Sequence, residues 1–184
     1  MTALKTASRL ARTTISLLIF VAIARAQAVS EYQVKALFIY NFAKFIEWPP
    51  ETFSNSHDPI TVCIAGQDPF GSEIDQAVKG KTVNSRELVI KRIGKSDDTK
   101  GCQVLFVGSI EKKHIKSLLS SVGTSNVLSV GENDGFPDMG GVIGFAMEGN
   151  KVRFDVNLEA ANRAHLKISS KLLSLARSVK EPGK

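Results

Sequence analysis

The side chains of this sequence that could carry out chemistry are three histidines and two cysteines, and the histidines are far apart. His57 stands in a polar segment, His114 in a segment with helical periodicity, and His165 near a junction between helices. A dedicated zinc site usually shows close spacings such as C-x-x-C, H-x-x-x-H or H-E-x-x-H. None of these spacings occurs, so the sequence predicts no metal site and no cofactor.

Nucleophilic catalysis and phosphate binding have equally little support. Ser109 follows a glycine but lacks the remainder of G-x-S-x-G and is interpreted as a helix cap. The segment 64–71 has the strand-turn-helix order of a phosphate site, but it does not match G-x-G-x-x-G, and Asp68 at the helix start would repel phosphate. The segment 135–144 is rich in glycine and has no P-loop lysine. It is interpreted as a turn where the backbone passes closely, with ligand or partner recognition as the alternative. The sequence therefore contains no recognised motif for nucleophilic catalysis or phosphate binding.

The two cysteines, Cys63 and Cys102, are expected to form one disulfide, because an even count in an oxidising compartment permits pairing. The bridge would close a loop of about 40 residues and is expected to be structural. Two alternatives stay open: a buried unpaired thiol, since Cys63 lies in an apolar strand, and a catalytic thiol.

The compartment follows from the first 28 residues, which have the pattern of an export signal. Basic residues at positions 5, 9 and 12 precede an apolar run over 15–24, which ends in the small-x-small sites 24–26 and 26–28. We expect cleavage after Ala26 or Ala28, with an uncleaved anchor as the alternative. No cysteine precedes Cys63, so the lipid attachment thiol is missing and a periplasmic or secreted protein is expected.

Removal of this segment reduces the net charge from +6 to +2, which does not favour nucleic-acid binding. About 156 residues remain, enough for one domain. The expected organisation is a signal peptide at 1–28, a single domain at 29–180 and a frayed end at 181–184.

The first mature element is expected to be a helix from Ser30 to Trp48, ended by Pro49 and Pro50. Its apolar residues extend beyond one helical face. Burial within the domain is one interpretation, and a partner or dimer surface is the other, because aromatic side chains are enriched at interfaces.

The remainder alternates short apolar strands with helices, which is typical of an α/β fold with a mainly parallel sheet and helices on both faces. A helix is expected to begin at Pro69, capped by Asp68. The expected strands are 60–65, 88–93, 104–107 and 127–130, with a helix at 111–122. The segments 142–147 and 151–156 flank a turn and predict a C-terminal antiparallel hairpin, followed by one broken or two short helices from 157 to about 179. The residues expected to face the core there are Leu166, Ile168, Leu172, Leu173, Leu175 and Ala176.

Four segments, in this order along the chain, resemble the family of YfiR-type periplasmic regulators and together span nearly the whole mature chain. They are YQVKALFIYNFAKFIEWP at 32–49, GQDPFG at 66–71, GGVIGF at 140–145 and LKISSKLLSLA at 166–176. The resemblance implies a non-enzymatic α/β protein that binds and represses an inner-membrane diguanylate cyclase through its periplasmic sensor region. Such a protein lowers cyclic-di-GMP signalling, and with it biofilm formation, without binding the nucleotide.

The resemblance further implies sequestration by an OmpA-like outer-membrane lipoprotein, and we expect a homodimer. The contact surface for the partner is predicted at Phe42, Lys44, Phe45 and Trp48, with a folding role for Asp68 and Gly140. No ligand-binding residues are predicted. The alternative functions are a periplasmic small-molecule binding protein and, less favoured, a secreted hydrolase or oxidoreductase.

Overall fold

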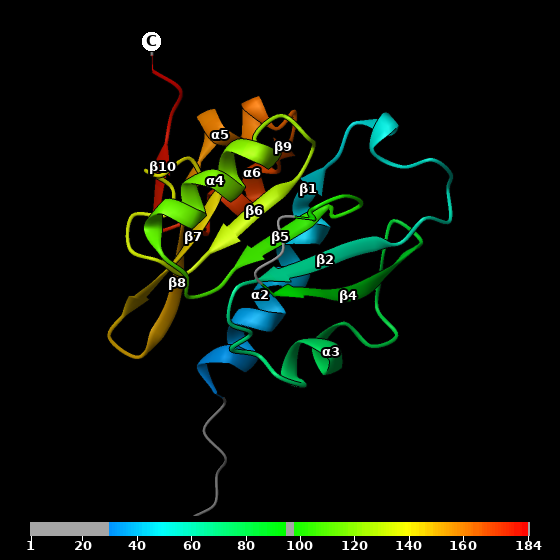
Figure 1. The fold of residues 1–184 in the computed structure, drawn as a ribbon, viewed down its shortest axis with the longest axis horizontal. Coiled ribbons are helices and arrows are strands. Elements are labelled where there is room, and N and C mark those ends of the chain that lie inside the picture. The colour runs from blue at the N-terminus through cyan, green and yellow to red at the C-terminus, as the bar shows by residue number, and fades with distance from the viewer. Residues whose placement is uncertain (1–29, 95–97, 184) are drawn as a thin grey trace, which may run out of the picture. The chain divides into compact units, whose positions relative to one another are not determined.

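A mixed eight-stranded sheet forms the centre of the protein (Figure 1), with strand order β10-β8-β7-β6-β5-β2-β4-β3. The computed structural model describes residues 30–94 and 98–183, so the predicted export signal lies outside the described part of the chain. A second, two-stranded sheet joins β1 to β9. The strands are β1 (Ile46–Glu47), β2 (Ile60–Ala65), β3 (Thr82–Val83), β4 (Arg86–Gly94), β5 (Val104–Val107), β6 (Leu128–Gly131), β7 (Ile143–Glu148), β8 (Lys151–Asn157), β9 (Lys167–Ile168) and β10 (Ser178–Lys180).

The middle of the large sheet is parallel, which confirms the expected α/β class. β2 pairs in parallel with β4 and β5, and β6 pairs in parallel with β5 and β7. All four residues of β5 and of β6 are buried. Strands buried on both faces are recognised by continuous apolar runs, and for this reason β2 and β5 have the bounds that the sequence predicts.

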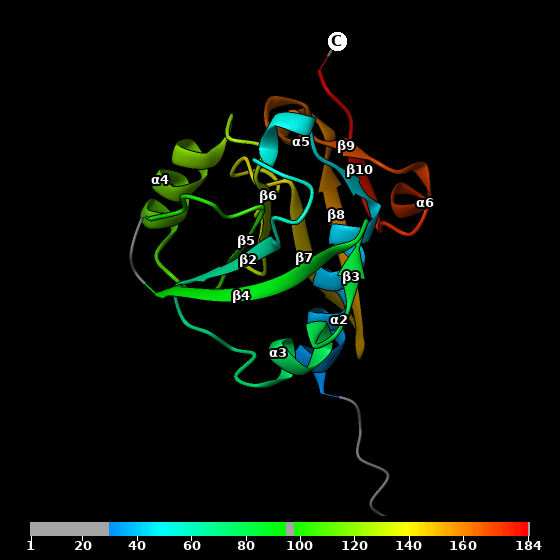
Figure 2. The same ribbon diagram turned by 90° about the vertical axis from the view of Figure 1, so that its right-hand side faces the viewer.

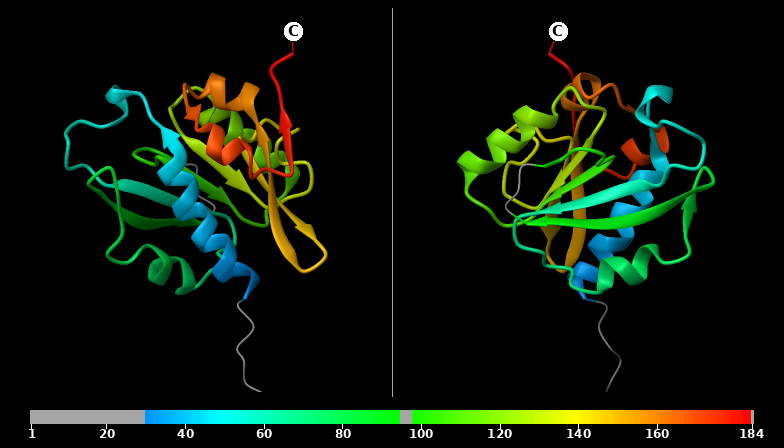
Figure 3. Two further views of the ribbon diagram at one scale, coloured as in Figure 1. Left: turned by 180° about the vertical axis from the view of Figure 1, so that it is seen from behind. Right: turned by 45° about the vertical axis from the view of Figure 1, so that its right-hand side comes forward.

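Helices cover both faces of the sheet. Figure 2 shows α4 on one side of the central strands and α2 on the other, and Figure 3 shows α2 crossing the back of the sheet. The α2 side carries a large apolar core that includes Phe42, Phe106 and Phe154, and the α4 side a smaller one that includes Leu105 and Leu118. The helices are α2 (Glu31–Phe45), α3 (Glu73–Val78), α4 (Lys112–Val122), α5 (Leu158–Arg163) and α6 (Ser170–Leu173).

The predicted hairpin is confirmed, because β7 and β8 pair antiparallel. Gly149, at the turn between them, has a φ of +58°, a conformation that glycine adopts without strain. β10 then adds to β8 in parallel. Arg177 fastens this junction with two hydrogen bonds to Asp155, and the hydroxyl of Ser178 donates a third to the same carboxylate. Burial tends to raise the pKa of Asp155, but the bonds from Arg177 and Ser178 outweigh it, and the pKa lies below its ordinary value.

Neither Asp68 nor Ser109, the two residues predicted to cap helices, caps one in the structure. Asp68 Oδ1 accepts a hydrogen bond from the N–H of Phe70 at 2.8 Å, which makes a turn, and α3 begins only at Glu73. Ser109 does not cap α4, whose N-cap is Glu111 with no side-chain cap bond. Asp and Ser satisfy turns as readily as helix ends, so sequence alone does not separate the two.

The first helix ends three residues earlier than predicted, since Ile46 and Glu47 extend into β1 and pair with Ile168 and Lys167. The C-terminal segment contains the two short helices that were expected, α5 and α6, and also β9 and β10, which were not expected. Leu175 does not face the core, because 57% of its surface is exposed.

Candidate functional site

The crevice where an open parallel sheet usually binds ligands is closed in this protein. Such a crevice lies where neighbouring strands send their loops to opposite faces, which here means between β2 and β5, because β2 leads to α3 and β5 to α4. The two loops are packed against each other: a Cβ atom added to Gly108 would overlap the carbonyl oxygen of Gln67, and one added to Gly66 would overlap Ile110. These glycines therefore allow the two loops to pack closely against each other between the strands.

Arg92 fixes the loop that follows β2. Its Nε donates to Asp68 at 2.7 Å, its Nη2 donates to the carbonyl of Gly71 at 2.7 Å, and its guanidinium also binds Asp75 on α3. The hydrogen bond from Arg92 lowers the pKa of Asp75, and the two carboxylates raise the pKa of Arg92. The guanidinium is thus occupied by carboxylates, and the loop is held by ion pairs.

The glycine-rich segment before β7 makes room for one aromatic ring. Phe136 is fully buried, and Cβ atoms added to Gly131 or Gly141 would overlap its ring. A Cβ on Gly144 would lie 2.6 Å from Cδ of Pro137. The close backbone approach that the sequence suggested is therefore a packing feature that folds the β6–β7 loop back onto the sheet.

Replacing Gly141 with alanine is expected to lower the free energy of unfolding by about 1–3 kcal/mol, because the new methyl group overlaps a ring that has no space to move. Urea unfolding of the purified protein measures this loss. Adding Phe136→Leu to Gly141→Ala should recover part of it, since the smaller side chain relieves the overlap. Strictly additive losses in the double variant would contradict this explanation.

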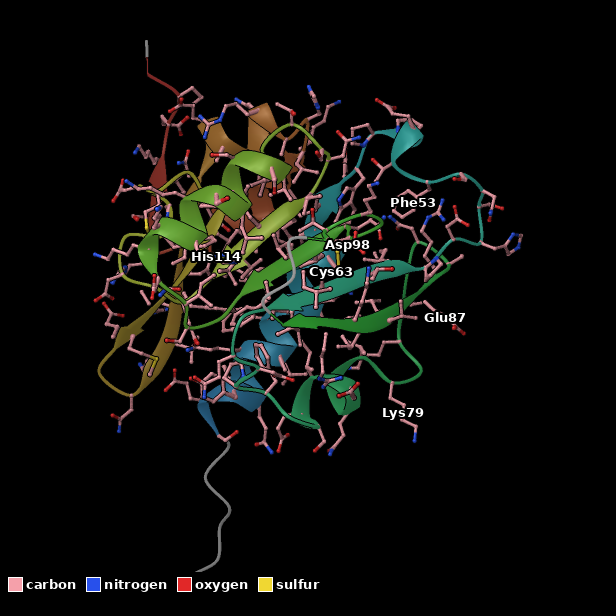
Figure 4. All side chains as sticks on the ribbon, viewed as in Figure 1. Phe53, Cys63, Lys79, Glu87, Asp98 and His114 are labelled. Carbon is pink, nitrogen blue, oxygen red and sulfur yellow. A yellow bond between two sulfur atoms is a disulfide. The ribbon has the colours of Figure 1, made fainter. Side chains whose placement is uncertain are left out.

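The predicted disulfide is present. Cys63 in β2 and Cys102, which precedes β5, are bonded to each other, with Cα atoms 5.7 Å apart, and both are buried. Figure 4 shows Cys63 on the central sheet. The bond ties the β4–β5 connection to the middle of the sheet, as a structural bridge does.

The histidines remain separate. The ring of His57 lies 3.1 Å from the hydroxyl of Ser56 in an exposed loop, and Nδ1 of His165 lies 3.1 Å from Oδ1 of Asn126. His114 is on α4 (Figure 4). Within the residues that the structure describes, no group of three His, Cys, Asp or Glu side chains could hold a metal ion.

A buried ion cluster on α2 is the feature that sequence reasoning missed. Lys35 is 4% exposed, and its ammonium lies 2.7 Å from Glu132, which follows β6, and 2.5 Å from Glu31, one helical turn earlier. The ammonium also lies 4.7 Å from the ring centre of Tyr32 and 5.7 Å from that of Phe145. The cluster joins the start of α2 to the β6–β7 loop. A signal was available, because Lys35 lies four residues before a core position, Ile39.

The pKa values follow from this burial. Burial alone would lower the pKa of Lys35, but the hydrogen bonds to Glu132 and Glu31 outweigh it, and the pKa is raised. Burial and the negative charge of Glu132 raise the pKa of Tyr32. The lysine is therefore a charged structural group at neutral pH.

The residues of the predicted contact surface have different environments. Phe42 has no exposed surface and packs against Phe145 and Phe154, with ring centres 5.6 and 5.0 Å away. It is a core residue and offers no surface to a partner. Lys44 is exposed, whereas Phe45 and Trp48 are half-buried.

The half-buried pair lies where α2 passes into β1. The ammonium of Lys171 on α6 lies 5.6 Å from the ring centre of Phe45. Trp48 packs edge-on against Phe53 at 6.4 Å, and its indole Nε1 is buried without a hydrogen-bond partner in the described part of the chain. Lys44, Phe45 and Trp48 together are called the α2 end surface below.

No helix in the described ranges, 30–94 and 98–183, is long and apolar enough to cross a membrane. The disulfide fits an oxidising compartment.

Two solved structures share the fold at low sequence identity. A conserved domain protein of Vibrio cholerae O1 biovar El Tor is 9% identical with a TM-score of 0.56, and the match covers 82% of this chain. An ABC domain of Streptococcus pneumoniae, solved in complex with L-Trp, is 10% identical with a TM-score of 0.52, and the match covers 78% of this chain. The present chain spans 60% of each of those chains. At this identity the likeness shows the fold alone.

The sequence comparison is more specific. The family described as YfiR/HmsC-like matches residues 32–177, which run from the second residue of α2 to the residue before β10. The match spans α2, the β2–α3 loop, the glycine-rich segment and α6, where the four resembling segments lie. The chain therefore belongs to the YfiR/HmsC-like family.

Proposed function

We propose that the mature protein is a periplasmic regulator that binds the periplasmic sensor region of an inner-membrane diguanylate cyclase and represses it, which lowers cyclic-di-GMP signalling. Membership of the YfiR/HmsC-like family is the observation that carries this proposal. The disulfide supports an oxidising compartment. The closed crevice between β2 and β5 supports action through a surface, since the usual ligand cleft of this fold is filled.

Repression of this kind is a population shift. A protein that binds the inactive conformation of a sensor more tightly than the active one moves the equilibrium toward inactivity by the ratio of the two affinities. No covalent chemistry is required, in agreement with the absence of a catalytic motif in the sequence. The activity of the regulator is therefore measured as an affinity and not as a rate.

The α2 end surface is the proposed contact. Lys44 supplies an exposed cation, and Phe45 and Trp48 supply aromatic surface that is only partly covered. Aromatic side chains are enriched in protein interfaces, and the exposed charge of Lys44 beside them can add specificity for an acidic partner. Phe42 supports the surface from below by fixing α2 against Phe145 and Phe154.

Reversing the charge at Lys44 is expected to lower the affinity for the sensor region at least about tenfold. In the proposed complex the new carboxylate would face the negative charge that Lys44 pairs with, and such a repulsion costs more than about 1.4 kcal/mol. Titration of the purified mature protein against the purified sensor region measures this change. Lys116→Glu is the matched control, since Lys116 is exposed on α4, on the other side of the sheet (Figure 2). Trp48→Ala should also weaken binding. Equal affinities for Lys44→Glu and Lys116→Glu would refute the α2 end surface.

The class of partner can be tested in the native host. A photo-crosslinking amino acid placed at position 44 of the exported protein should capture a membrane protein with a cyclase domain, and the same amino acid at position 116 should not. Mass spectrometry identifies what is captured. Capture of no membrane protein from either position under several growth conditions would overturn the repressor proposal.

The proposal includes two further associations. An OmpA-like outer-membrane lipoprotein would sequester the regulator and relieve repression, and the regulator would act as a homodimer. Sedimentation of the purified protein measures the dimer directly. The crosslinking experiment described above would recover the lipoprotein under conditions that relieve repression.

A periplasmic small-molecule binding protein is the alternative function. The streptococcal domain that shares the fold was solved with an amino acid bound. Against this alternative, the β2 and β5 loops fill the crevice in the present chain. A thermal-shift screen with periplasmic metabolites distinguishes the two functions, because a dedicated binding protein is strongly stabilised by its ligand.

A further inference from the structure

A cavity of about 360 Å³ lies on the α4 side of the protein, away from the closed crevice and from the α2 end surface. The second half of α4, the start of β6, the segment Met139–Val142 and α5 form its walls. Figure 2 shows β6 between α4 and α5. The volume is at the small end of the range for ligand sites, so it fits a small molecule.

Small residues create this space. Gly123, at the end of α4, and Gly140, in the loop, have no side chains to fill it, and Ala160 and Ala164 contribute only methyl groups. Larger apolar side chains complete the walls, among them Leu119, Val122, Val127 and Met139. The thioether of Met139 is adaptable, as suits the wall of a binding site. The interior therefore favours a short apolar tail.

The polar side chains in the walls are Arg163, which only donates hydrogen bonds, and Ser120, Thr124 and Ser129, whose hydroxyls donate and accept. Arg163 is the one charged residue among the lining side chains of the described chain, and no carboxylate lines the cavity. A Cβ atom added to Gly140 would lie 3.8 Å from Nη2 of Arg163, so the guanidinium faces the glycine segment. The partner of Arg163 is Glu159, at 2.7 Å, and both side chains are about half exposed. An exposed pair of this kind contributes little, so the guanidinium can exchange this carboxylate for that of a ligand.

Ser129 adds a second donor from the buried wall. It is 3% exposed, and its Oγ accepts a hydrogen bond from the N–H of Val142 at 2.9 Å. Within the described residues no acceptor is found for its own O–H. Buried hydroxyl donors are ordinarily satisfied, and an oxygen atom of a ligand in the cavity would satisfy this one.

We propose that this cavity binds a small carboxylic acid with a branched apolar tail and no ammonium group, its carboxylate on Arg163 and its tail among Leu119, Val122 and Met139. An amino acid fits less well, because its ammonium group would lie beside the cationic guanidinium of Arg163, and no carboxylate lines the cavity to pair with it. The bound acid would contact the β6–β7 loop and α5 at once and would signal the presence of such acids to the regulator. Binding of the acid is independent of the proposed function, since it concerns this chain alone, whereas the signalling role rests on that function.

The methionines allow a direct test on the purified mature protein. Once the signal peptide with Met1 is removed, the chain has two methionines: Met139 in the cavity wall and Met147 on the β7–β8 hairpin, which is 44% exposed. Methyl-labelled protein is titrated with 4-methylpentanoate and followed by NMR. We expect a saturable shift of the Met139 methyl signal with a dissociation constant of about 1 mM or lower, and no shift of the Met147 signal.

Two ligands test the chemistry of recognition. Leucine has the same tail with an added ammonium group, and 4-methylpentan-1-ol has the tail without a charge. Both are expected to bind at least about tenfold more weakly than the acid. The alcohol loses the charge-assisted bond to Arg163, and leucine brings an ammonium group that is left unpaired. If the alcohol binds as tightly as the acid, or if none of the three shifts the Met139 signal, the proposal is overturned.

Three variants test the site. Arg163→Gln should weaken binding of 4-methylpentanoate at least about tenfold. Its matched control is Arg153→Gln, which breaks a comparable exposed ion pair, with Glu148 at 3.0 Å, on the hairpin. Ser120→Phe introduces a ring into the cavity from an exposed helical position and should abolish binding while the protein remains folded. Equal affinities in Arg163→Gln and Arg153→Gln would overturn the role of Arg163, and full affinity in Ser120→Phe would overturn the location.

Discussion

Replacing Lys35 with alanine is expected to lower the free energy of unfolding by about 3–5 kcal/mol. Lys35 is 4% exposed, and its ammonium neutralises two carboxylates, at 2.5 and 2.7 Å. Its removal leaves Glu132, whose side chain is only 15% exposed, without its cation. An unpaired buried charge is far more costly than an absent pair. Urea unfolding of the purified mature protein measures the loss.

A second variant separates the charge effect from lost packing. Lys35→Met combined with Glu132→Gln removes the two buried charges, leaves only the more exposed Glu31, and keeps most of the volume, so it should recover most of the stability that Lys35→Ala loses. Arg153→Ala is the control for an ordinary ion pair at the surface, and should change the free energy of unfolding by no more than about 1 kcal/mol. A loss for Lys35→Ala as small as that for Arg153→Ala would contradict the buried-cluster interpretation.

This cluster also bears on function, because it lies on the same helix as the α2 end surface. Lys35 fixes the start of α2 to the β6–β7 loop, and Lys44 lies at the other end of the helix. Loosening the contact between Lys35 and Glu132 is therefore expected to change the position of Lys44. Lys35→Met with Glu132→Gln therefore provides a folded protein in which repression can be measured with this anchor removed.

Removing the disulfide has the other large expected effect. The double variant Cys63→Ala/Cys102→Ala should lose about 4 kcal/mol, because the bond, with a sequence separation of 39, constrains the unfolded chain. Both sulfur atoms are buried, so their removal also leaves small cavities. Denaturant unfolding should show a lower midpoint and a steeper slope, since an unfolded chain without the crosslink exposes more surface.

Unfolding of the unaltered protein with a thiol reductant present is the matched control. The reduced protein and the double alanine variant should agree within about 1 kcal/mol, since both lack the crosslink and differ only in two sulfur atoms. A double variant as stable as the oxidised protein would show that the bridge contributes nothing to folding stability. If the free energy of unfolding falls in the double alanine variant and does not fall on reduction, the effect is due to lost packing and not to the lost crosslink.

The periodicity of apolar residues predicted the strands at the centre of the sheet. β2 and β5 have the predicted bounds, and β7 and β8 form the predicted hairpin, because buried strands and tight turns carry their signal within a few residues. The short strands β1, β3, β9 and β10 were not predicted. Two or three residues pair in each of them, and a pairing of that length depends on which segment lies beside it in space.

The candidate sites divide in the same way. The disulfide was predictable from two cysteines and an export signal, because compartment and count are properties of the sequence. Phe42 was misjudged as a contact residue, since it is in the core, and the burial of Lys35 on the same helix was missed. Hydropathy gives only the average tendency of a residue type, phenylalanine to be buried and lysine to be exposed, and does not decide the environment of a single side chain.

The sequence by itself determined the α/β class, the central parallel strands, the hairpin and the cysteine pair, because each depends on local patterns or on composition. Tertiary structure alone decided that the loops after β2 and β5 pack against each other, that Glu132 meets Lys35, and that small residues from three segments leave a cavity beside Arg163. The physical reason is distance along the chain: Lys35 and Glu132 are 97 residues apart. Their interaction energy exists only after the sheet has brought α2 and the β6–β7 loop together.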